Sequence, residues 1–194
     1  MGIIVAIDGP SGAGKSSTAK AIASRAGWNY LDTGALYRAV TWLALEYKCE
    51  EPFAILQAIK DHPIRFDADP ESPNVFAGST QITHAIRGTS VTENVSRFSA
   101  MPEIRHELLK LQHFIIDSAK RGIVVEGRDI GTVVAPEAGL KIYLTADLDA
   151  RAARRENEID DKDVDVKTSL DNRDVIDSTR AVSPLTMAAD AVEV

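Results

Sequence analysis

Cysteine is almost absent from this sequence. The one cysteine, Cys49, excludes an internal disulfide and any zinc site built from several cysteines. No apolar run approaches the roughly 20 residues that a membrane-spanning helix needs. Near the amino terminus Gly9 interrupts a short apolar run, so we expect no signal peptide there. These absences predict a cytoplasmic protein.

Histidine is also scarce, and its spacing contains no metal-binding pattern such as H-E-x-x-H. The string G-x-S-x-G, which marks the nucleophile of many serine hydrolases, does not occur. We therefore interpret the four histidines as structural or surface residues: His62, His84, His106 and His113.

Basic residues are outnumbered, since 22 Lys and Arg face 29 Asp and Glu, for a formal net charge of −7. This balance disfavours general binding to nucleic acid or to an anionic membrane, because both need a basic surface. The apolar content of 44% and the length of 194 residues suit one soluble α/β domain with its own core. If the ligand is an anion, the basic residues must be gathered in one place.

Residues 9–16 give such a ligand a site, because they read Gly-Pro-Ser-Gly-Ala-Gly-Lys-Ser and match the phosphate-binding pattern G-x-x-x-x-G-K-[ST]. Glycines allow successive backbone N–H groups to curl around an anion. Lys15 supplies a positive charge near the β and γ phosphates, and the hydroxyl of Ser16 is placed for Mg²⁺. The loop lies between an apolar run at Ile3–Ile7 and helix-forming residues at Ser17–Ala26, as a phosphate-binding loop should.

Strand and helix patterns alternate over much of the chain, which favours a parallel sheet covered by helices. We expect helices at Ala35–Tyr47, Pro52–Lys60 and Thr168–Arg180, and strands at Trp28–Leu31, Ile123–Val125, Lys141–Leu144 and Ala191–Val194. Residues 63–90 break this rhythm with three prolines, a strand at Ile64–Phe66 and a hairpin formed by Asn74–Ala77 and Gln81–Ile82. Helices at Val91–Phe98 and Pro102–Ala119 follow it.

The predicted fold is therefore an α/β P-loop sandwich of three layers, with a central parallel sheet, an inserted substrate-binding subdomain and a helical lid. We expect one domain whose core is 1–62, 101–150 and 181–194, with the insert at about 63–100 and the lid at about 151–180. The run Glu156–Asp165 holds six acids and one lysine, which is typical of a solvated, mobile connector.

Three polar clusters follow strand ends or share one helix face. Thr33 and Arg38 face the crevice where ligands of open α/β sheets bind, although a cap and a surface arginine would explain them equally well. In Glu126–Asp129, Arg128 can fork onto a phosphate, Asp129 can accept from an amino group and Glu126 can hold Mg²⁺ through water. A turn ion pair between Arg128 and Asp129 is the alternative.

The third cluster is Arg173, Asp177 and Arg180, at offsets of four and seven on one helix face. An ion pair on a solvated helix would explain it. A closing lid is the other interpretation, because it would bring cations onto a transferring phosphoryl group together with a neighbouring set: Arg151, Arg154 and Arg155.

In this order the motifs resemble the bacterial type of cytidylate kinase, over essentially the whole chain. The resemblance lies in Ile7–Lys15, Leu31–Arg38, Glu126–Val134, Arg173–Asp174 and Asp177–Leu185. It implies ATP-dependent phosphorylation of CMP and dCMP with Mg²⁺. Members of that family usually continue past the strand at which Val194 stands, so we expect a truncated or fused chain.

The resemblance also implies a role for each matched residue. Cytosine would be read by Thr33, Arg105 and Asp129, the CMP phosphate held by Arg38, Arg128 and Arg180, and the sugar contacted by Ser96, Arg173 and Asp177. ATP would occupy the loop that comprises Gly9, Pro10, Ser11, Gly12, Ala13, Gly14, Lys15, Ser16 and Ser17. The metal would be held by Ser16 and Glu126, and the catalytic residues would be Lys15, Arg128, Arg173 and Arg180.

The expected partners are therefore the small molecules ATP and CMP or dCMP, with no nucleic acid and no membrane, and a monomeric chain. A P-loop kinase of another monophosphate or small molecule is the first alternative. A non-enzymatic nucleotide switch is a remote one, because the strings N-K-x-D and D-x-x-G of GTPase switches do not occur in the chain.

Overall fold

A parallel sheet of five strands forms the centre of the molecule, which we describe from a computed structural model for residues 2–156 and 166–194. The strand order is β2-β6-β1-β7-β8, and every neighbouring pair is parallel. The strands are β1 (Ile3–Asp8), β2 (Asn29–Asp32), β6 (Gly122–Gly127), β7 (Leu140–Tyr143) and β8 (Val192–Glu193). They confirm the strands expected from the sequence, with bounds shifted by at most two residues.

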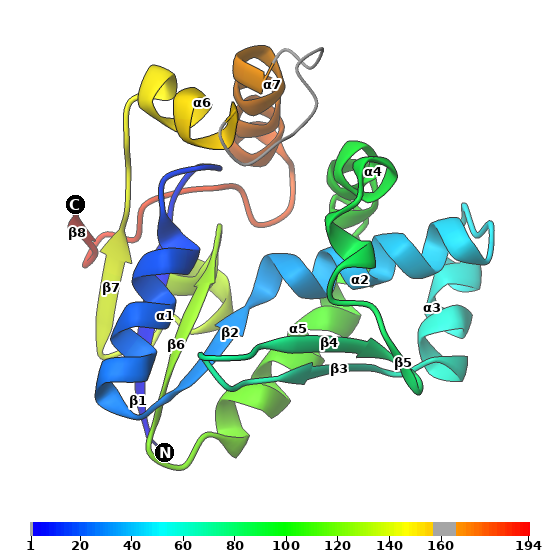
Figure 1. Cartoon of the computed structure of the whole chain (residues 1–194), viewed down its shortest axis with the longest axis horizontal. Coiled ribbons are helices and arrows are strands. Elements are labelled where there is room, and N and C mark those ends of the chain that lie inside the picture. Colours follow the sequence, from blue (N-terminus) through cyan, green and yellow to red (C-terminus); the bar gives the residue numbers. More distant parts are fainter. Residues whose placement is uncertain (1, 157–165) are drawn as a thin grey trace.

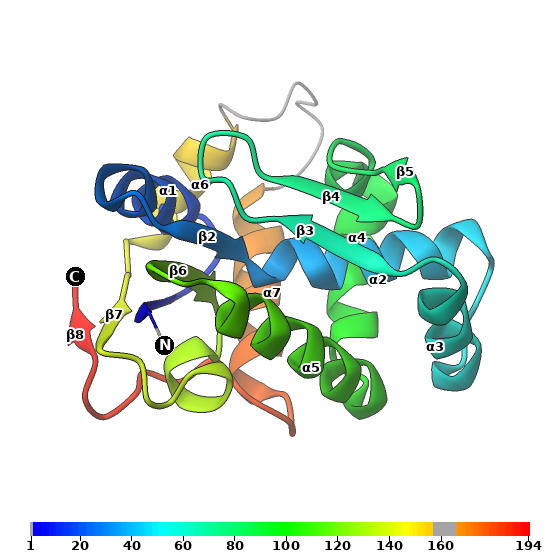
Figure 2. The ribbon, with the colours of Figure 1, turned by 90° about the horizontal axis from the view of Figure 1, so that it is seen from below.

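Helices cover both faces of this sheet, because alternate residues of β1 belong to two different apolar clusters. Val5 and Ile7 pack with Ala19 and Ala23 of α1 (Lys15–Ala26). Ile4 and Ala6 belong instead to the larger cluster, to which α2 (Thr33–Glu46), α3 (Pro52–Asp61) and α5 (Pro102–Ser118) contribute. Figure 1 shows α1 in front of the strands, and Figure 2 shows α5 on the other side of the sheet. The α/β fold with a central parallel sheet is confirmed.

A second, antiparallel sheet of three strands lies against α2, apart from the main sheet (Figure 2). It is formed by β3 (Ile64–Asp67), β4 (Asn74–Ala77) and β5 (Thr80–Gln81), and confirms the expected strand and hairpin. The short 3-10 helix η1 (Ala85–Arg87) and helix α4 (Thr89–Ser99) follow and also contact α2. In α4, Val91, Val95 and Phe98 are buried at helical spacing, so one face of the helix is fixed on the core.

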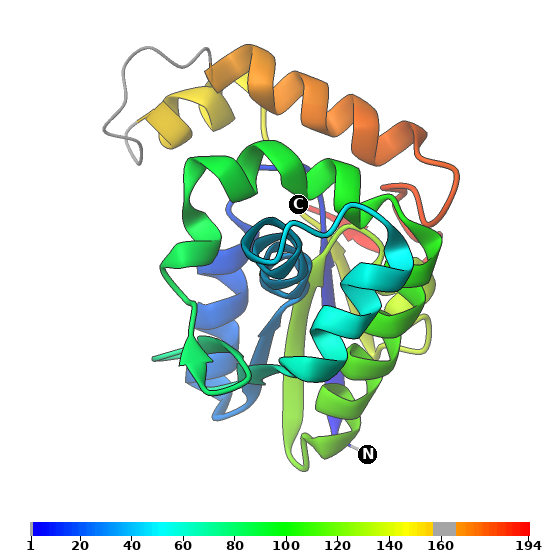
Figure 3. The ribbon, with the colours of Figure 1, turned by 90° about the vertical axis from the view of Figure 1, so that its right-hand side faces the viewer.

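Two helices, α6 (Leu148–Glu156) and α7 (Val166–Thr179), lie across the ends of the strands where the carboxyl termini of β1 and β6 emerge (Figures 1 and 3). Helix α7 also contacts α4. Of the acidic connector, residues 157–165 lie outside the described part of the chain. None of the helices formed by the described residues is long and apolar enough to cross a membrane.

Candidate functional site

The glycine loop connects β1 to α1, and its shape depends on positions that favour glycine over any other residue. Gly9 has a φ of +146°, and a Cβ there would come within 2.0 Å of the carbonyl oxygen of Leu144. Gly14, with a φ of +97°, precedes the first residue of α1, Lys15. The N-terminus of α1 therefore opens onto the loop, where its unpaired N–H groups and dipole favour an anion.

Lys15 is buried, with 8% of its surface exposed, and its Nζ donates to the carbonyl oxygen of Pro10 at 2.7 Å. Burial and the nearby guanidinium of Arg128 lower the pKa of Lys15. The charged, ammonium form of Lys15 is thus disfavoured inside the loop, and more negative charge nearby would stabilise it. The phosphates of a nucleotide would supply that charge.

Glu126 and Ser16 lie side by side and form the oxygen donors of a possible magnesium site. The hydroxyl of Ser16 donates to Oε2 of Glu126 at 3.0 Å, and the Tyr30 hydroxyl donates to Oε1. Burial and the neighbouring carboxylate of Asp32 raise the pKa of Glu126. The sequence predicted Glu126 in the loop after the strand. It lies instead within strand β6, so the sheet holds its backbone in place.

The described residues contain no cluster of three or more His, Cys, Asp or Glu side chains that could cage a metal. One carboxylate beside one hydroxyl nevertheless fits Mg²⁺, which is usually bound through one or two protein oxygens, several waters and the substrate phosphates.

Residues at the start of α2 line the other half of the site. Asp32 caps the helix by accepting the N–H of Ala35 at 2.9 Å, and the Thr33 hydroxyl donates to the carbonyl of Glu126 at 2.8 Å. Arg38 is 8% exposed, and its Nη1 donates to the carbonyl of Ile86 and to the hydroxyl of Thr92. The alternatives of a capping Thr33 and a surface Arg38 are therefore wrong.

Asp129 pairs with Arg105 and not with its neighbour in sequence. Nη2 of Arg105 donates to Oδ2 of Asp129 at 2.5 Å, and both side chains are about nine-tenths buried. The guanidinium of Arg105 also lies over the ring of Tyr37, 5.2 Å from its centre, and donates to the carbonyl of Ser99. The predicted alternative, a turn ion pair between Arg128 and Asp129, is wrong.

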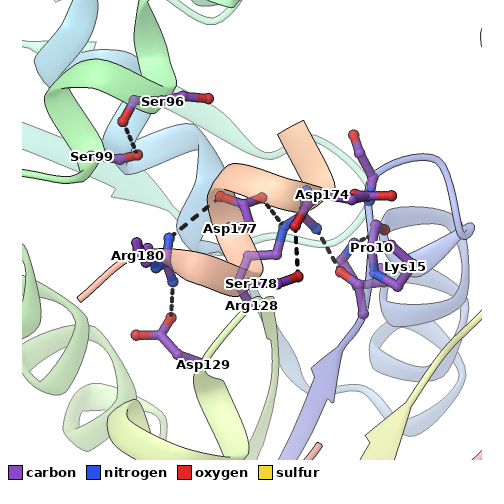
Figure 4. Close-up of polar contacts among 12 residues, drawn as sticks. Pro10, Lys15, Ser96, Ser99, Arg128, Asp129, Asp174, Asp177, Ser178 and Arg180 are labelled. Atoms are coloured by element: carbon purple, nitrogen blue, oxygen red, sulfur yellow. Dashed lines mark hydrogen bonds and ion pairs between the residues drawn. The ribbon is translucent and has the colours of Figure 1, made fainter. Parts of the chain in front are cut away.

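Helix α7 places Asp177 between two arginines, as Figure 4 shows. Nε of Arg128 donates to Asp177 at 2.7 Å, and Arg180 lies 3.5 Å from Asp177 and 3.8 Å from Asp129. Asp177 is buried, so the alternative of an ion pair on a solvated helix face is also wrong. Burial and the nearby Arg105 lower the pKa of Arg180, whose Nη2 has no hydrogen-bond partner among the described residues.

The arginines expected on α6 differ in their contacts. Arg151 is buried and bonds both the carbonyl of Ser11 and the carboxylate of Asp174, which in turn accepts the N–H of Ser11 at 3.2 Å. It therefore ties α6 and α7 to the glycine loop and does not face a substrate. Arg154 lines the cavity, and the side chain of Arg155 lies outside the described residues.

Three residues that shape the site could not be assigned a role from the sequence. Asp8, at the end of β1, accepts the N–H groups of Ile130 and Gly131 and so fixes the loop that carries Asp129. Tyr30 orients Glu126, and Arg87 reaches into the cavity from η1. The acid just before the glycine loop was a visible signal for Asp8; no spacing in the sequence indicated the other two.

Most of these side chains line one cavity of about 880 Å³, near the upper end of the roughly 300–1,000 Å³ typical of small-molecule sites. Nine basic and four acidic side chains face it, although the whole chain carries a net charge of −7. The expected concentration of basic residues in one place is confirmed. The cavity brings together Lys15, Ser16 and Glu126 with every residue predicted for the second substrate: Thr33, Arg38, Ser96, Arg105, Arg128, Asp129, Arg173, Asp177 and Arg180.

Two kinds of comparison agree on the family. The model of the family "Cytidylate kinase" matches residues 5–194. The chain is 49% identical over 195 residues to a cytidylate kinase of Streptomyces avermitilis, covering 99% of this chain and 84% of that protein. It is 45% identical over 201 residues to a cytidylate kinase of Streptococcus mutans, covering 99% and 88%. The chain therefore belongs to the cytidylate kinase family.

Proposed function

We propose that this protein transfers the γ-phosphoryl group of ATP to the phosphate of CMP or dCMP, giving ADP and the nucleoside diphosphate. The observation that carries the proposal is the basic cavity of an acidic protein, with a phosphate-binding loop on one side and several arginines on the other. A protein that only bound ATP would have no use for the second set of cations.

On the donor side, ATP occupies the loop Gly9–Ser17, with its phosphates on the N-terminus of α1 and on Lys15. When the phosphates arrive, Lys15 exchanges the carbonyl of Pro10 for them. Glu126 and Ser16 would hold Mg²⁺, which would neutralise charge on the ATP phosphates.

On the acceptor side, Arg38, Arg128 and Arg180 hold the phosphate of CMP. Arg180 supports this role because it is buried, carries a lowered pKa and has an N–H group without a hydrogen-bond partner among the described residues. A doubly charged phosphate would supply the missing acceptor and favour the charged guanidinium.

Cytosine is read by Thr33, Arg105 and Asp129, which lie next to one another around the end of β6. A carboxylate accepts from the exocyclic amino group of cytosine, and it would oppose the oxygen that uracil carries in the same place. Ser96, Arg173 and Asp177 line the remaining wall and contact the sugar.

The acceptor is already an anionic oxygen, so the reaction needs no strong general base. Charge neutralisation and in-line positioning are supplied by Lys15, Arg128, Arg173 and Arg180, with the water-excluding cover of α6 and α7. In this account residues 63–100 form the substrate-side insert and 151–180 the lid. We expect the chain to act as a monomer in the cytoplasm, where its nucleotide substrates are found.

The experiment is direct detection of products. The chain is incubated with ATP, Mg²⁺ and CMP, and nucleotides are separated by ion-exchange chromatography. We expect CDP and ADP to appear in equal amounts. ADP formed without CDP would show ATP hydrolysis alone, and no ADP at all would favour a nucleotide switch; either result contradicts the proposal.

A further inference from the structure

Arg87 lines the cavity but belongs to neither the donor set nor the acceptor set of residues proposed above. It ends η1, in the region that carries the second sheet, and its side chain is 59% exposed. Its Nη2 bonds Oδ2 of Asp32 at 2.8 Å across the cavity wall. A long, half-exposed arginine at a substrate cavity can change partner without unfolding anything.

The surroundings of Arg87 link it to residues of both proposed phosphate sites, because Arg87, Lys15 and Arg38 line the same cavity. On the donor side, Asp32 and Glu126 interact electrostatically with Arg87 and also with Lys15, so the two cations share the same pair of carboxylates. On the acceptor side, the carbonyl of Ile86, the residue just before Arg87, accepts Nη1 of Arg38 at 3.2 Å. In the proposed reaction the phosphoryl group moves from the side of Lys15 to the side of Arg38, within the cavity that Arg87 also lines.

The pairing with Asp32 is easily exchanged. Asp32 is only 12% exposed, but the side chain of Arg87 is 59% exposed, so water screens its guanidinium and the pair contributes less to stability than a fully buried one. Asp32 does not depend on Arg87 for its position, since its other oxygen caps α2 through the N–H of Ala35. A phosphate carries more charge than a carboxylate and accepts two parallel N–H bonds from a guanidinium.

We propose that Arg87 is a further phosphate-binding residue, which leaves Asp32 and binds the phosphates of the two nucleotides where donor and acceptor meet. The proposal rests on the proposed function, because it assumes two phosphates in one cavity. Since Arg87 belongs to the same short segment that holds Arg38, its contact would couple the position of that segment to occupation of both sites.

The test compares Arg87→Gln and Arg87→Lys with the wild type. The readouts are kcat, the KM for each substrate, and the calorimetric affinity for a bisubstrate probe in which five phosphates join adenosine and cytidine. We expect Arg87→Gln to lower kcat by about 10²-fold and the affinity for the probe by at least about tenfold. ATP alone and CMP alone should each bind within about threefold of wild type, because neither fills the meeting point. Arg87→Lys should recover only part of kcat, since it keeps the charge and loses the fork.

Arg97→Gln is the matched control, because Arg97 is an exposed arginine of the neighbouring helix α4 that pairs with Glu50 and does not line the cavity. It should retain wild-type kcat and probe affinity. The proposal is overturned if Arg87→Gln retains wild-type kcat and binds the probe as tightly as the wild type. It is also overturned if thermal unfolding shows that Arg87→Gln has lost its fold whereas Arg87→Lys is fully active, because charge at a structural tie would then be sufficient. Failure of the proposed function is seen separately, as a wild type that makes no CDP.

Discussion

At the scale of single residues, the site is a set of buried charges that are only partly neutralised by one another. Arg128 is shared by Asp177 and the carbonyl of Gly9, and Arg180 has no full hydrogen-bond complement among the described residues. Arg128 and Arg180 are therefore held in place before a substrate arrives. Such preorganised charge is what phosphoryl transfer needs, because little rearrangement remains to be done in the transition state.

Lys15→Ala tests the donor side. The substitution removes the ammonium group that lies inside the glycine loop, so we expect kcat to fall by about 10²–10³-fold. The affinity for CMP, measured by calorimetry without ATP, should stay within about twofold, because the arginines of the acceptor side are untouched. A variant with near-wild-type turnover would remove Lys15 from the mechanism.

Asp8→Asn tests the buried carboxylate behind the site. Burial raises the pKa of Asp8, against the two N–H bonds from Gly131 and Ile130 that lower it. A folded-state pKa above the unfolded value means that the wild type loses stability as pH rises through the raised pKa. The asparagine variant has lost hydrogen bonds but carries no such charge. The cost of the substitution should therefore shrink as pH rises from 4 to 7.

The measurement is the difference between the free energies of urea unfolding of wild type and Asp8→Asn at several pH values. Other carboxylates titrate in both proteins and cancel in the difference. A cost that grows with pH would mean that folding lowers the pKa of Asp8. That result would contradict the raised pKa that its burial causes.

At the scale of elements, the glycine loop depends on close contact between β1 and β7. Gly9→Ala would push a Cβ against the carbonyl of Leu144 at a backbone conformation that side chains rarely adopt. We expect it to lower the free energy of unfolding by about 1–3 kcal/mol and to weaken ATP binding, because the loop has to shift. Denaturant unfolding and calorimetry measure the two effects.

Gly139→Ala is the matched control for this prediction. It lies in the turn before β7, and the nearest atom to its Cβ is 3.8 Å away, the carbonyl oxygen of Ile4. Its unfolding free energy should stay within about 0.5 kcal/mol of wild type. If both variants behave alike, the close approach at Gly9 does not shape the loop.

Most helices and strands could be predicted from the sequence, because their signals are local: apolar periodicity, a capping Asp32 and a closing Gly27. The three clusters of the site could also be found, since each follows a strand or occupies one helix face. Their partners could not. Arg128 and Asp177 are 49 residues apart, and Arg151 and Ser11 are 140 apart, so their pairing depends on how α6 and α7 fold over the sheet.

At the scale of the whole molecule, charge is distributed against its sum. A chain of net charge −7 places nine basic side chains around one cavity, which favours the entry of an anionic ligand there. Composition showed the sum, and only the fold shows the distribution. In the proposed reaction the same arrangement would bring both phosphates to one place, and the residues around β6 that we propose to read the base would select the acceptor.

The most direct test of this account is a substrate panel. ADP release is measured by a coupled assay with ATP, Mg²⁺ and CMP, dCMP, UMP or AMP, and kcat/KM is compared across the four acceptors. The account predicts the highest values for CMP and dCMP, because Asp129 beside Arg105 accepts from the amino group of cytosine. A preference for UMP or AMP would contradict it.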